Sequence, residues 1–115
     1  GAVFLVRRPP EGLLGGLWAF PSGRRAAGES LEAALRRAVR EKLGVVAAIQ
    51  RKVGAVPHAY SHYRITLHGY LCVSAGAGLA AGEGKGWMGP GARRRHAIPR
   101  ADRKLLDLIL EEETP

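Results

Sequence analysis

Residues 30–44 carry the start and stop signals of a single helix, and they constrain the fold more than any other segment of the chain. Ser30 can cap the first turn with its hydroxyl group, and Gly44 can end the helix in a left-handed conformation. The apolar residues between them recur at a spacing of four: Leu31, Leu35, Val39 and Leu43. This spacing gives the helix one apolar face, so a second layer is needed to cover that face.

Strand patterns flank this helix on both sides. Residues 2–8 form a nearly continuous apolar run that is closed by two prolines, which is typical of a buried strand. Residues 45–56 combine apolar and basic side chains and indicate a second strand, which ends at Pro57. Residues 63–73 alternate cleanly, and their apolar face consists of Tyr63, Ile65, Leu67, Leu71 and Val73. We expect the glycine-rich residues 74–86 to be a poorly ordered connector.

A second helix is predicted near the end of the chain, beginning at Pro99 or Arg100. Its buried positions would be Ala101, Leu105, Leu108 and Ile109. Strands interleaved with two helices predict an α/β sandwich in which helices cover a mixed β-sheet, with Trp18 and Phe20 filling the core under a loop. A length of 115 residues suits one domain spanning 1–115, and a strand that begins almost at the first residue suggests a fragment of a larger protein.

Charge and cysteine content narrow the class of protein. The formal net charge is +8, which attracts polyanions such as nucleic acid, although a solvated basic face gives the same total. Cys72 is the single cysteine, so the chain holds no disulfide framework and no iron–sulfur site. Residues 65–82 lack charged side chains, but their glycines and His68 exclude a membrane span. No signal peptide pattern opens the chain, and we expect a cytoplasmic protein.

The segment from Gly23 to Val45 resembles the Nudix box, a loop–helix–loop motif that holds Mg²⁺ in hydrolases of nucleoside diphosphate derivatives. In that box, a glycine and a glutamate precede the pattern Arg-Glu-apolar-any-Glu-Glu-any-Gly-apolar. The positions that match in register, without a gap, are Gly23, Glu29, Arg37, Val39, Glu41, Gly44 and Val45. The resemblance implies a Nudix-like α/β/α sandwich with one box helix and one C-terminal helix.

The carboxylates that would hold the metal are mostly missing from this box. Residues 38, 41 and 42 lie at i, i+3 and i+4 on one flank of a helix, where three carboxylates can bind Mg²⁺. Here Ala38 offers no ligand, and Lys42 places a positive charge beside Glu41. Repulsion between that charge and a divalent cation is on the order of several kcal/mol at about 4 Å, so we predict no metal site. Glu29 is expected to pair with Arg37 and to fix the loop onto the helix.

Further segments resemble the C-terminal domain of MutY-type adenine DNA glycosylases, a Nudix-like domain without the metal-binding glutamates. They are VRRPPEGLLGGLWAFPSG at 6–23, HAYSHYRITLHGYL at 58–71 and AIPRADRKLL at 97–106. The resemblance covers nearly the whole chain and implies a domain of base-excision repair that reads 8-oxoguanine opposite a misincorporated adenine in double-stranded DNA. A separate N-terminal catalytic domain, which would carry the iron–sulfur cluster, would remove the adenine. We therefore assign no catalytic residue and no cofactor to this chain.

The lesion-contacting tripeptide that this resemblance implies is an aromatic residue, Ser and His, and it falls on Tyr60, Ser61 and His62. The oxidised base presents an N–H donor at N7, where guanine presents an acceptor. A serine hydroxyl can accept from that N–H, and such contacts give about 1–3 kcal/mol of discrimination. Without the resemblance, Ser61 reads as a turn residue, and Tyr60 serves equally well as a core or rim aromatic.

Basic side chains in the glycosylase-like segments are the candidates for contacts with the DNA backbone, where charge supplies affinity without sequence information. They are His58, Arg64, Arg100 and Lys104. Another group is interpreted as a solvated helix face: Arg24, Arg25, Arg36 and Arg40. The histidines share no metal ion, since His68 would lie on the order of 20 Å from His62 along an extended strand. We expect a monomer in the bacterial nucleoid whose partners are DNA and its own catalytic domain.

The alternative function is a Nudix hydrolase that cleaves an oxidised or other nucleoside triphosphate with a degenerate metal site. It would depend on Glu29, Glu41 and acids from elsewhere in the chain, and the total of Asp and Glu is only 10. Nucleotide turnover in the presence of Mg²⁺ would distinguish the two functions. A protein-interaction scaffold, with neither turnover nor DNA binding, is a third possibility.

Overall fold

The computed structural model describes residues 2–11, 15–75 and 79–113. One antiparallel sheet has the strand order β2-β1-β5 and consists of β1 (Val3–Arg7), β2 (Trp18–Ala19) and β5 (Lys85–Met88). A second antiparallel sheet is the long hairpin of β3 (Val46–Ala59) and β4 (Arg64–Ala75). The helices are α1 (Leu31–Leu43), α2 (Pro90–Arg95) and α3 (Arg100–Glu113). In this part of the chain, no helix is long and apolar enough to cross a membrane.

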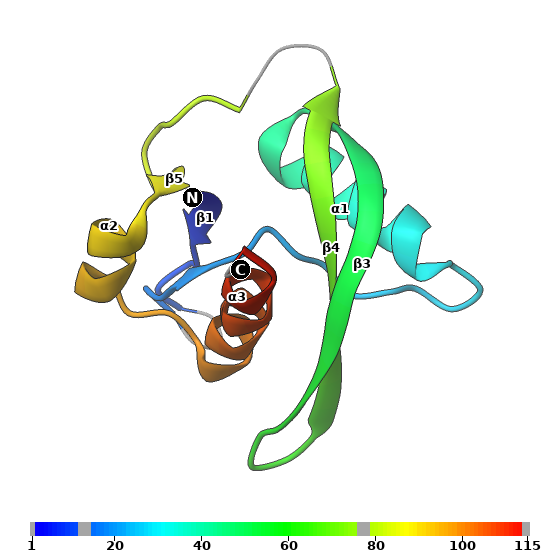
Figure 1. The fold of residues 1–115 in the computed structure, drawn as a ribbon. Coiled ribbons are helices and arrows are strands. Elements are labelled where there is room, and N and C mark those ends of the chain that lie inside the picture. The colour runs from blue at the N-terminus through cyan, green and yellow to red at the C-terminus, as the bar shows by residue number, and fades with distance from the viewer. Residues whose placement is uncertain (1, 12–14, 76–78, 114–115) are drawn as a thin grey trace.

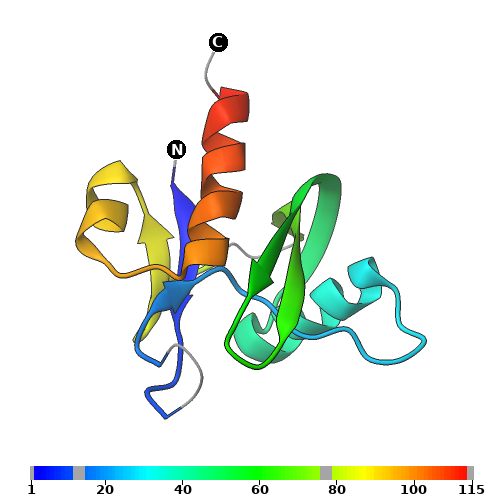
Figure 2. The same cartoon turned by 90° about the horizontal axis from the view of Figure 1, so that it is seen from below.

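Helix α3 lies between the two sheets, and α1 and α2 lie at opposite ends of the molecule (Figures 1 and 2). The contact of α3 with the hairpin is a cluster of buried side chains, Val56, Ala101 and Leu105. A second cluster joins the three-stranded sheet to the segment before α3, and its members are Leu5, Met88 and Ile98. Phe20 packs against both clusters and Trp18 against the second, which confirms that these two aromatics fill the core.

Helix α1 has the ends that its sequence predicts. The Ser30 hydroxyl accepts a hydrogen bond from the backbone N–H of Ala33 at 3.1 Å, which satisfies one donor of the first turn. Gly44 ends the helix in the left-handed region at φ 68°, and its N–H donates to the carbonyl of Arg40. The helix buries Ala34, Ala38 and Val39, and it packs against β3. The box helix is therefore confirmed with its predicted bounds.

The expected α/β architecture with a capped box helix is confirmed, but the expectation of a mixed sheet is not met by the strands that are described. All of their pairings are antiparallel. The tight turn at 60–63 forces β3 and β4 to run in opposite directions, and β2 and β5 both run opposite to β1 between them.

A third helix, α2, also appears where only a lead into the last helix was expected. Pro90 starts it at a position that suits its fixed φ, and the buried Arg93 donates to the carbonyl of Met88 at 3.2 Å.

Two boundaries differ from the sequence-based expectation. Strand β3 continues through Pro57, which is in register with Thr66. Because β3 has only β4 as a neighbour among the described strands, the missing N–H of the proline can face the open edge. The segment 74–86 is also more ordered than expected. Its residues 76–78 lie outside the described part, but Gly82 pairs with Lys85 and β5 begins at Lys85.

Helix α3 approaches the hairpin closely at two facing glycines. Gly54 and Gly69 are partners across the two strands, and a Cβ at Gly69 would lie 2.3 Å from a terminal carbon of Leu105. The apolar face of β4 is therefore covered only in part, around Leu67 and Gly69. Leu71 and Val73, farther along the same face, are 36% and 49% exposed.

Candidate functional site

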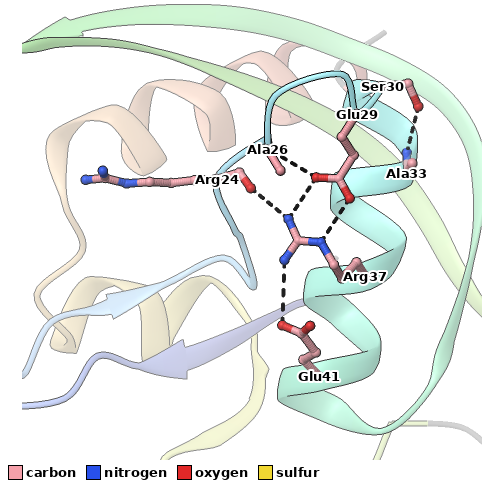
Figure 3. Close-up of polar contacts among 7 residues, drawn as sticks. All are labelled: Arg24, Ala26, Glu29, Ser30, Ala33, Arg37 and Glu41. Atoms are coloured by element: carbon pink, nitrogen blue, oxygen red, sulfur yellow. Dashed lines mark hydrogen bonds and ion pairs between the residues drawn. The ribbon is translucent and has the colours of Figure 1, made fainter.

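The loop before α1 is clamped to the helix by one arginine (Figure 3). The guanidinium of Arg37 donates to both carboxylate oxygens of Glu29, at 2.9 Å each, and to the backbone carbonyl of Arg24 at 2.9 Å. The same carboxylate accepts from the backbone N–H of Ala26 at 3.0 Å. Glu41 adds a longer ion pair to Arg37 at 3.7 Å. The predicted pairing of Glu29 with Arg37 is confirmed, and this pair fixes the course of the loop.

The electrostatics of this clamp keep Glu29 ionised. Hydrogen bonds from Arg37 and from the Ala26 N–H lower the pKa of Glu29 from 4.5 to about 2. The same pairing raises the pKa of Arg37 above its ordinary value. Both oxygens of Glu29 are thus occupied by donors within the loop and the helix. This carboxylate serves as a structural acceptor.

The other box positions are arranged in a way that disfavours a divalent cation. Ala38 is 2% exposed and lies under the loop, where a Cβ at Gly23 would stand only 2.7 Å from the Cβ of Ala38. The Lys42 ammonium donates to the backbone carbonyl of Ser22. Desolvation of this ammonium, followed by the charge of Arg8, lowers the pKa of Lys42. The cation of Lys42 is therefore tied to the loop beside the position where the metal would bind.

The residues present do not fit a bound Mg²⁺ ion. Mg²⁺ demands near-octahedral coordination by oxygen atoms, usually from one or two carboxylates together with substrate phosphates and water. Here Glu41 is the single carboxylate of the usual trio, its side chain is 63% exposed, and it pairs with Arg37 at 3.7 Å. Within residues 2–11, 15–75 and 79–113, no group of three or more His, Cys, Asp or Glu side chains could hold a metal.

The proposed lesion-contacting tripeptide lies at the turn of the long hairpin. The backbone N–H of Tyr60 donates to the carbonyl of Tyr63 at 2.8 Å, and this bond closes the turn. Ser61 and His62 form the tip between them and are exposed. The Tyr60 ring lies 5.0 Å from the Tyr63 ring and 4.6 Å from the His58 ring, measured between centroids. An aromatic cluster therefore lies at the base of the tip that Ser61 and His62 form.

The remaining candidates for backbone contacts fall into two places. His58 and Arg64 belong to the strand ends next to the tip, where Arg64 is exposed and starts β4. Arg100 and Lys104 are exposed one turn apart on α3, which is a separate element. The structure thus groups the tripeptide with two of its four basic candidates and places the other two on the adjacent helix.

Two residues at this site were not selected from the sequence. The guanidinium carbon of Arg24 lies 6.0 Å from the centroid of the Tyr63 ring, within cation–π range. Tyr63 had been interpreted as part of a strand face, and Arg24 as part of a solvated helix face. The sequence does offer a signal for Tyr63, because it is an aromatic residue directly after the tripeptide. No sequence pattern relates Arg24 to the hairpin, because the loop brings it there only in three dimensions.

The tip borders a groove with a volume of about 1170 Å³. Its lining is mostly apolar, and it also includes the aromatic rings of Tyr60 and Tyr63 and four basic side chains: Arg8, Arg24, Arg25 and Arg64. The carboxylate of Asp102, also in the lining, accepts from the backbone N–H of Phe20 at 3.0 Å, and burial raises its pKa. This combination of aromatic and cationic groups suits an anionic ligand with flat rings, such as a nucleic acid or a nucleotide.

The profile of the NUDIX domain matches residues 1–108. Together with the loop–helix–loop geometry around Arg37, this match defines the class: the chain belongs to the Nudix family. The relatives that align with this chain include both hydrolases and DNA glycosylases.

The chain is 30% identical to the CTP pyrophosphohydrolase of Escherichia coli, over 96% of its own length and 83% of that enzyme. It is 33% identical to the 8-oxo-dGTP diphosphatase of Proteus vulgaris, over 60% of its own length and 62% of the relative. It is 35% identical to the adenine DNA glycosylase of Mus musculus over 75% of its own length, but it spans only 17% of that protein.

Two solved structures have folds similar to that of this chain. The E. coli ORF135 protein has a TM-score of 0.82 and 28% identity, with coverage of 99% of this chain and 83% of the other. The C-terminal domain of mouse MUTYH, solved in complex with human PCNA, has a TM-score of 0.69 and 25% identity, with coverage of 97% and 77%. The hydrolase sequences match this chain over more of their own length than the glycosylase sequence does. The similarity therefore favours the hydrolase alternative over the glycosylase interpretation.

Proposed function

We propose that this chain is the DNA-lesion recognition domain of an adenine DNA glycosylase and that it reads 8-oxoguanine opposite adenine without chemistry of its own. The observation that carries the proposal is that the Nudix box makes structural contacts at the positions where a metal site would need carboxylates. Ala38 is buried under Gly23, Lys42 donates to the Ser22 carbonyl, and the carboxylate of Glu29 accepts from the helix residue Arg37 and from the loop N–H of Ala26. Each contact gives the box a structural role in place of a metal-binding role.

The hairpin tip supports DNA reading as the function that replaces hydrolysis. Ser61 is exposed at a turn that Tyr60 and Tyr63 close, so its hydroxyl can reach a base edge without rearrangement of the fold. The hydroxyl can accept from the N7–H of 8-oxoguanine, which guanine lacks. His62 and Tyr60 would flank this contact. The tripeptide therefore supplies recognition at a position that a protein domain can press against duplex DNA.

Basic side chains around the tip would supply the salt-dependent part of the affinity. Arg64 and His58 lie on the hairpin, and Arg100 and Lys104 lie on α3. Contacts of these groups with phosphates would orient the domain without specifying a sequence. In this proposal the excision chemistry and the iron–sulfur cluster belong to a separate N-terminal domain of the same protein, which is a partner of residues 1–115.

The second candidate function is hydrolysis of a nucleoside triphosphate, and it has a specific observation in its favour. The E. coli CTP pyrophosphohydrolase matches 96% of this chain at 30% identity, and the chain spans 83% of it. An active hydrolase would need acids other than the box trio, since only Glu41 remains there. The arrangement of Lys42 and Ala38 counts against this function, whereas the extent of the match counts for it.

Two assays on the same protein preparation separate the candidates. The first measures binding of a fluorescent duplex that contains 8-oxoguanine opposite adenine, with a guanine–adenine duplex as the reference. The second measures release of phosphate or pyrophosphate from 8-oxo-dGTP, CTP and the common nucleoside triphosphates with Mg²⁺. The proposal predicts salt-dependent binding of DNA and no turnover. Turnover that is abolished by Glu41→Gln would instead establish the hydrolase.

The role of Ser61 is tested in the full-length protein. Ser61→Ala is expected to reduce the preference for the 8-oxoguanine duplex by about 1–3 kcal/mol while leaving the affinity for the undamaged duplex unchanged. Ser74→Ala, which removes the same hydroxyl from the other end of β4, is the matched control and should retain the preference. An unchanged preference in Ser61→Ala would remove the assigned contact.

A further inference from the structure

The clamp on the Nudix loop positions more than the loop itself. Arg37 donates to the carbonyl of Arg24, and the Arg24 side chain extends away from α1 (Figure 3). Its guanidinium reaches the Tyr63 ring at 6.0 Å, next to the hairpin tip. The clamp of Glu29 and Arg37 thus fixes the backbone from which Arg24 projects. One arginine of the Nudix box therefore lies beside the residues that are proposed to read the base.

We propose that Arg24 and Tyr63 form a binding subsite for a DNA backbone phosphate beside the base that Ser61 reads, and that Glu29 and Arg37 are its positioning residues. This inference rests on the proposed DNA-binding function. A guanidinium above an aromatic ring keeps its N–H donors in its own plane, where they can donate to two phosphate oxygens at once. Tyr63 is 37% exposed, so the ring supports the guanidinium at the surface.

The position of the subsite follows from the turn. The bond between the Tyr60 N–H and the Tyr63 carbonyl brings the Tyr63 backbone next to the tip, and Ser61 lies within that turn. A base held against Ser61 places phosphates of its own strand nearby, since successive phosphates border each nucleotide. Arg24 would therefore hold the lesion-bearing strand in register, while Ser61 reads the base edge. This phosphate contact would raise the affinity of the domain for every DNA sequence and would not discriminate between bases.

The effect of Glu29→Gln on DNA binding distinguishes a positioning role of Glu29 from a general effect of net charge. Glu29→Gln raises the net charge of the chain by one, so a general electrostatic effect would strengthen DNA binding. Loss of the bidentate clamp, in contrast, releases the loop and lets Arg24 leave Tyr63. We therefore expect Glu29→Gln to weaken binding although the protein becomes more basic. The ionised state of Glu29 persists across the neutral range because its pKa is about 2.

The test is the salt dependence of duplex binding by the chain, measured by fluorescence anisotropy between 50 and 200 mM salt. Removal of one phosphate contact reduces the steepness of the plot of log affinity against log salt concentration by about 0.9. Between 50 and 200 mM salt, the variant should therefore lose about 3.5-fold less affinity than the unmodified chain. We expect this change for Arg24→Gln and for Glu29→Gln, and no further change in the double variant. Arg94→Gln, which removes an equal charge from α2 at the opposite end of the molecule, should leave the slope unchanged. Arg24→Lys should restore part of the slope.

The outcomes separate this inference from the proposed function. If the unmodified chain binds no duplex, the DNA-binding function fails and the subsite fails with it. If the chain binds duplex but Arg24→Gln keeps the slope of the unmodified chain, the subsite is refuted and the function stands. Unfolding curves recorded for Glu29→Gln show whether the variant is folded. If it is not, Tyr63→Leu, which removes the supporting ring, must reproduce the effect of Arg24→Gln or the inference is overturned.

Discussion

The contact between Gly23 and Ala38 makes a specific prediction about the converted box. In Gly23→Ala, the new Cβ would stand 2.7 Å from the Cβ of Ala38, which is closer than two methyl groups can approach. The helix backbone at Ala38 is held by its neighbours, so the loop must move outward. That movement stretches the bonds from Lys42 to Ser22 and from Arg37 to Arg24.

The size of the effect follows from overpacking. Forced displacement of a packed contact of this kind destabilises a protein by about 1–3 kcal/mol. At an unfolding entropy of about 2.1 cal/mol/K per residue, a domain of this size loses about 4 °C in Tm for each kcal/mol. We therefore expect Gly23→Ala to lower Tm by about 4–12 °C, as measured by circular dichroism on heating.

The exchange of the two residues provides the decisive comparison. Ala38→Gly alone should be destabilising by about 1 kcal/mol, because glycine is a poor helix former. The double variant Gly23→Ala with Ala38→Gly again has one Cβ at the contact, so it should cost little more than Ala38→Gly alone. The coupling energy between the two sites should then be about 1–3 kcal/mol. Additive destabilisation in the double variant would refute the contact and the tight seating of the loop on Ala38.

Two other predictions concern stability. Leu105→Ala removes a buried side chain that fills the space above Gly69. It should lower the free energy of unfolding, measured with guanidinium, by about 2–5 kcal/mol. A loss below about 1 kcal/mol would show that α3 does not rest on the hairpin there. The pKa of Glu29 is lowered from 4.5 to about 2 in the fold, so its pairing stabilises the protein fully above pH 4.5 and progressively less as pH falls toward 2. The stability difference between the unmodified chain and Glu29→Gln should therefore shrink across this pH window, and a difference independent of pH would contradict the pairing.

The sequence predicted the parts of the fold that local chemistry determines. Ser30 and Gly44 define α1 through backbone hydrogen bonds that any helix needs, and Glu29 pairs with Arg37 because their spacing brings opposite charges together. Ser61 lies within a turn, as its residue type alone predicts, and the role of the tripeptide remains a prediction. These features depend on residues that are close in sequence or joined by one helix.

The features that could not be predicted depend on contacts between distant segments. The facing glycines Gly54 and Gly69 let α3 approach the hairpin, but a glycine in a strand pattern does not reveal which helix will cover it. The strand alternation gave no sign that α3 leaves Val73 exposed. The meeting of Arg24 with Tyr63 likewise results from the course of a loop that only the folded chain defines.

In this interpretation the Nudix box of this chain is a structural clamp and not a metal centre. This interpretation is tested most directly by titrating Mn²⁺ into isotope-labelled protein and recording the paramagnetic broadening of backbone amide signals. We expect weak broadening spread over exposed carboxylates, with no selective loss of signals around Glu41 and Lys42. Selective loss of the signals of 38–42 at stoichiometric Mn²⁺, reversed by Glu41→Gln, would contradict it.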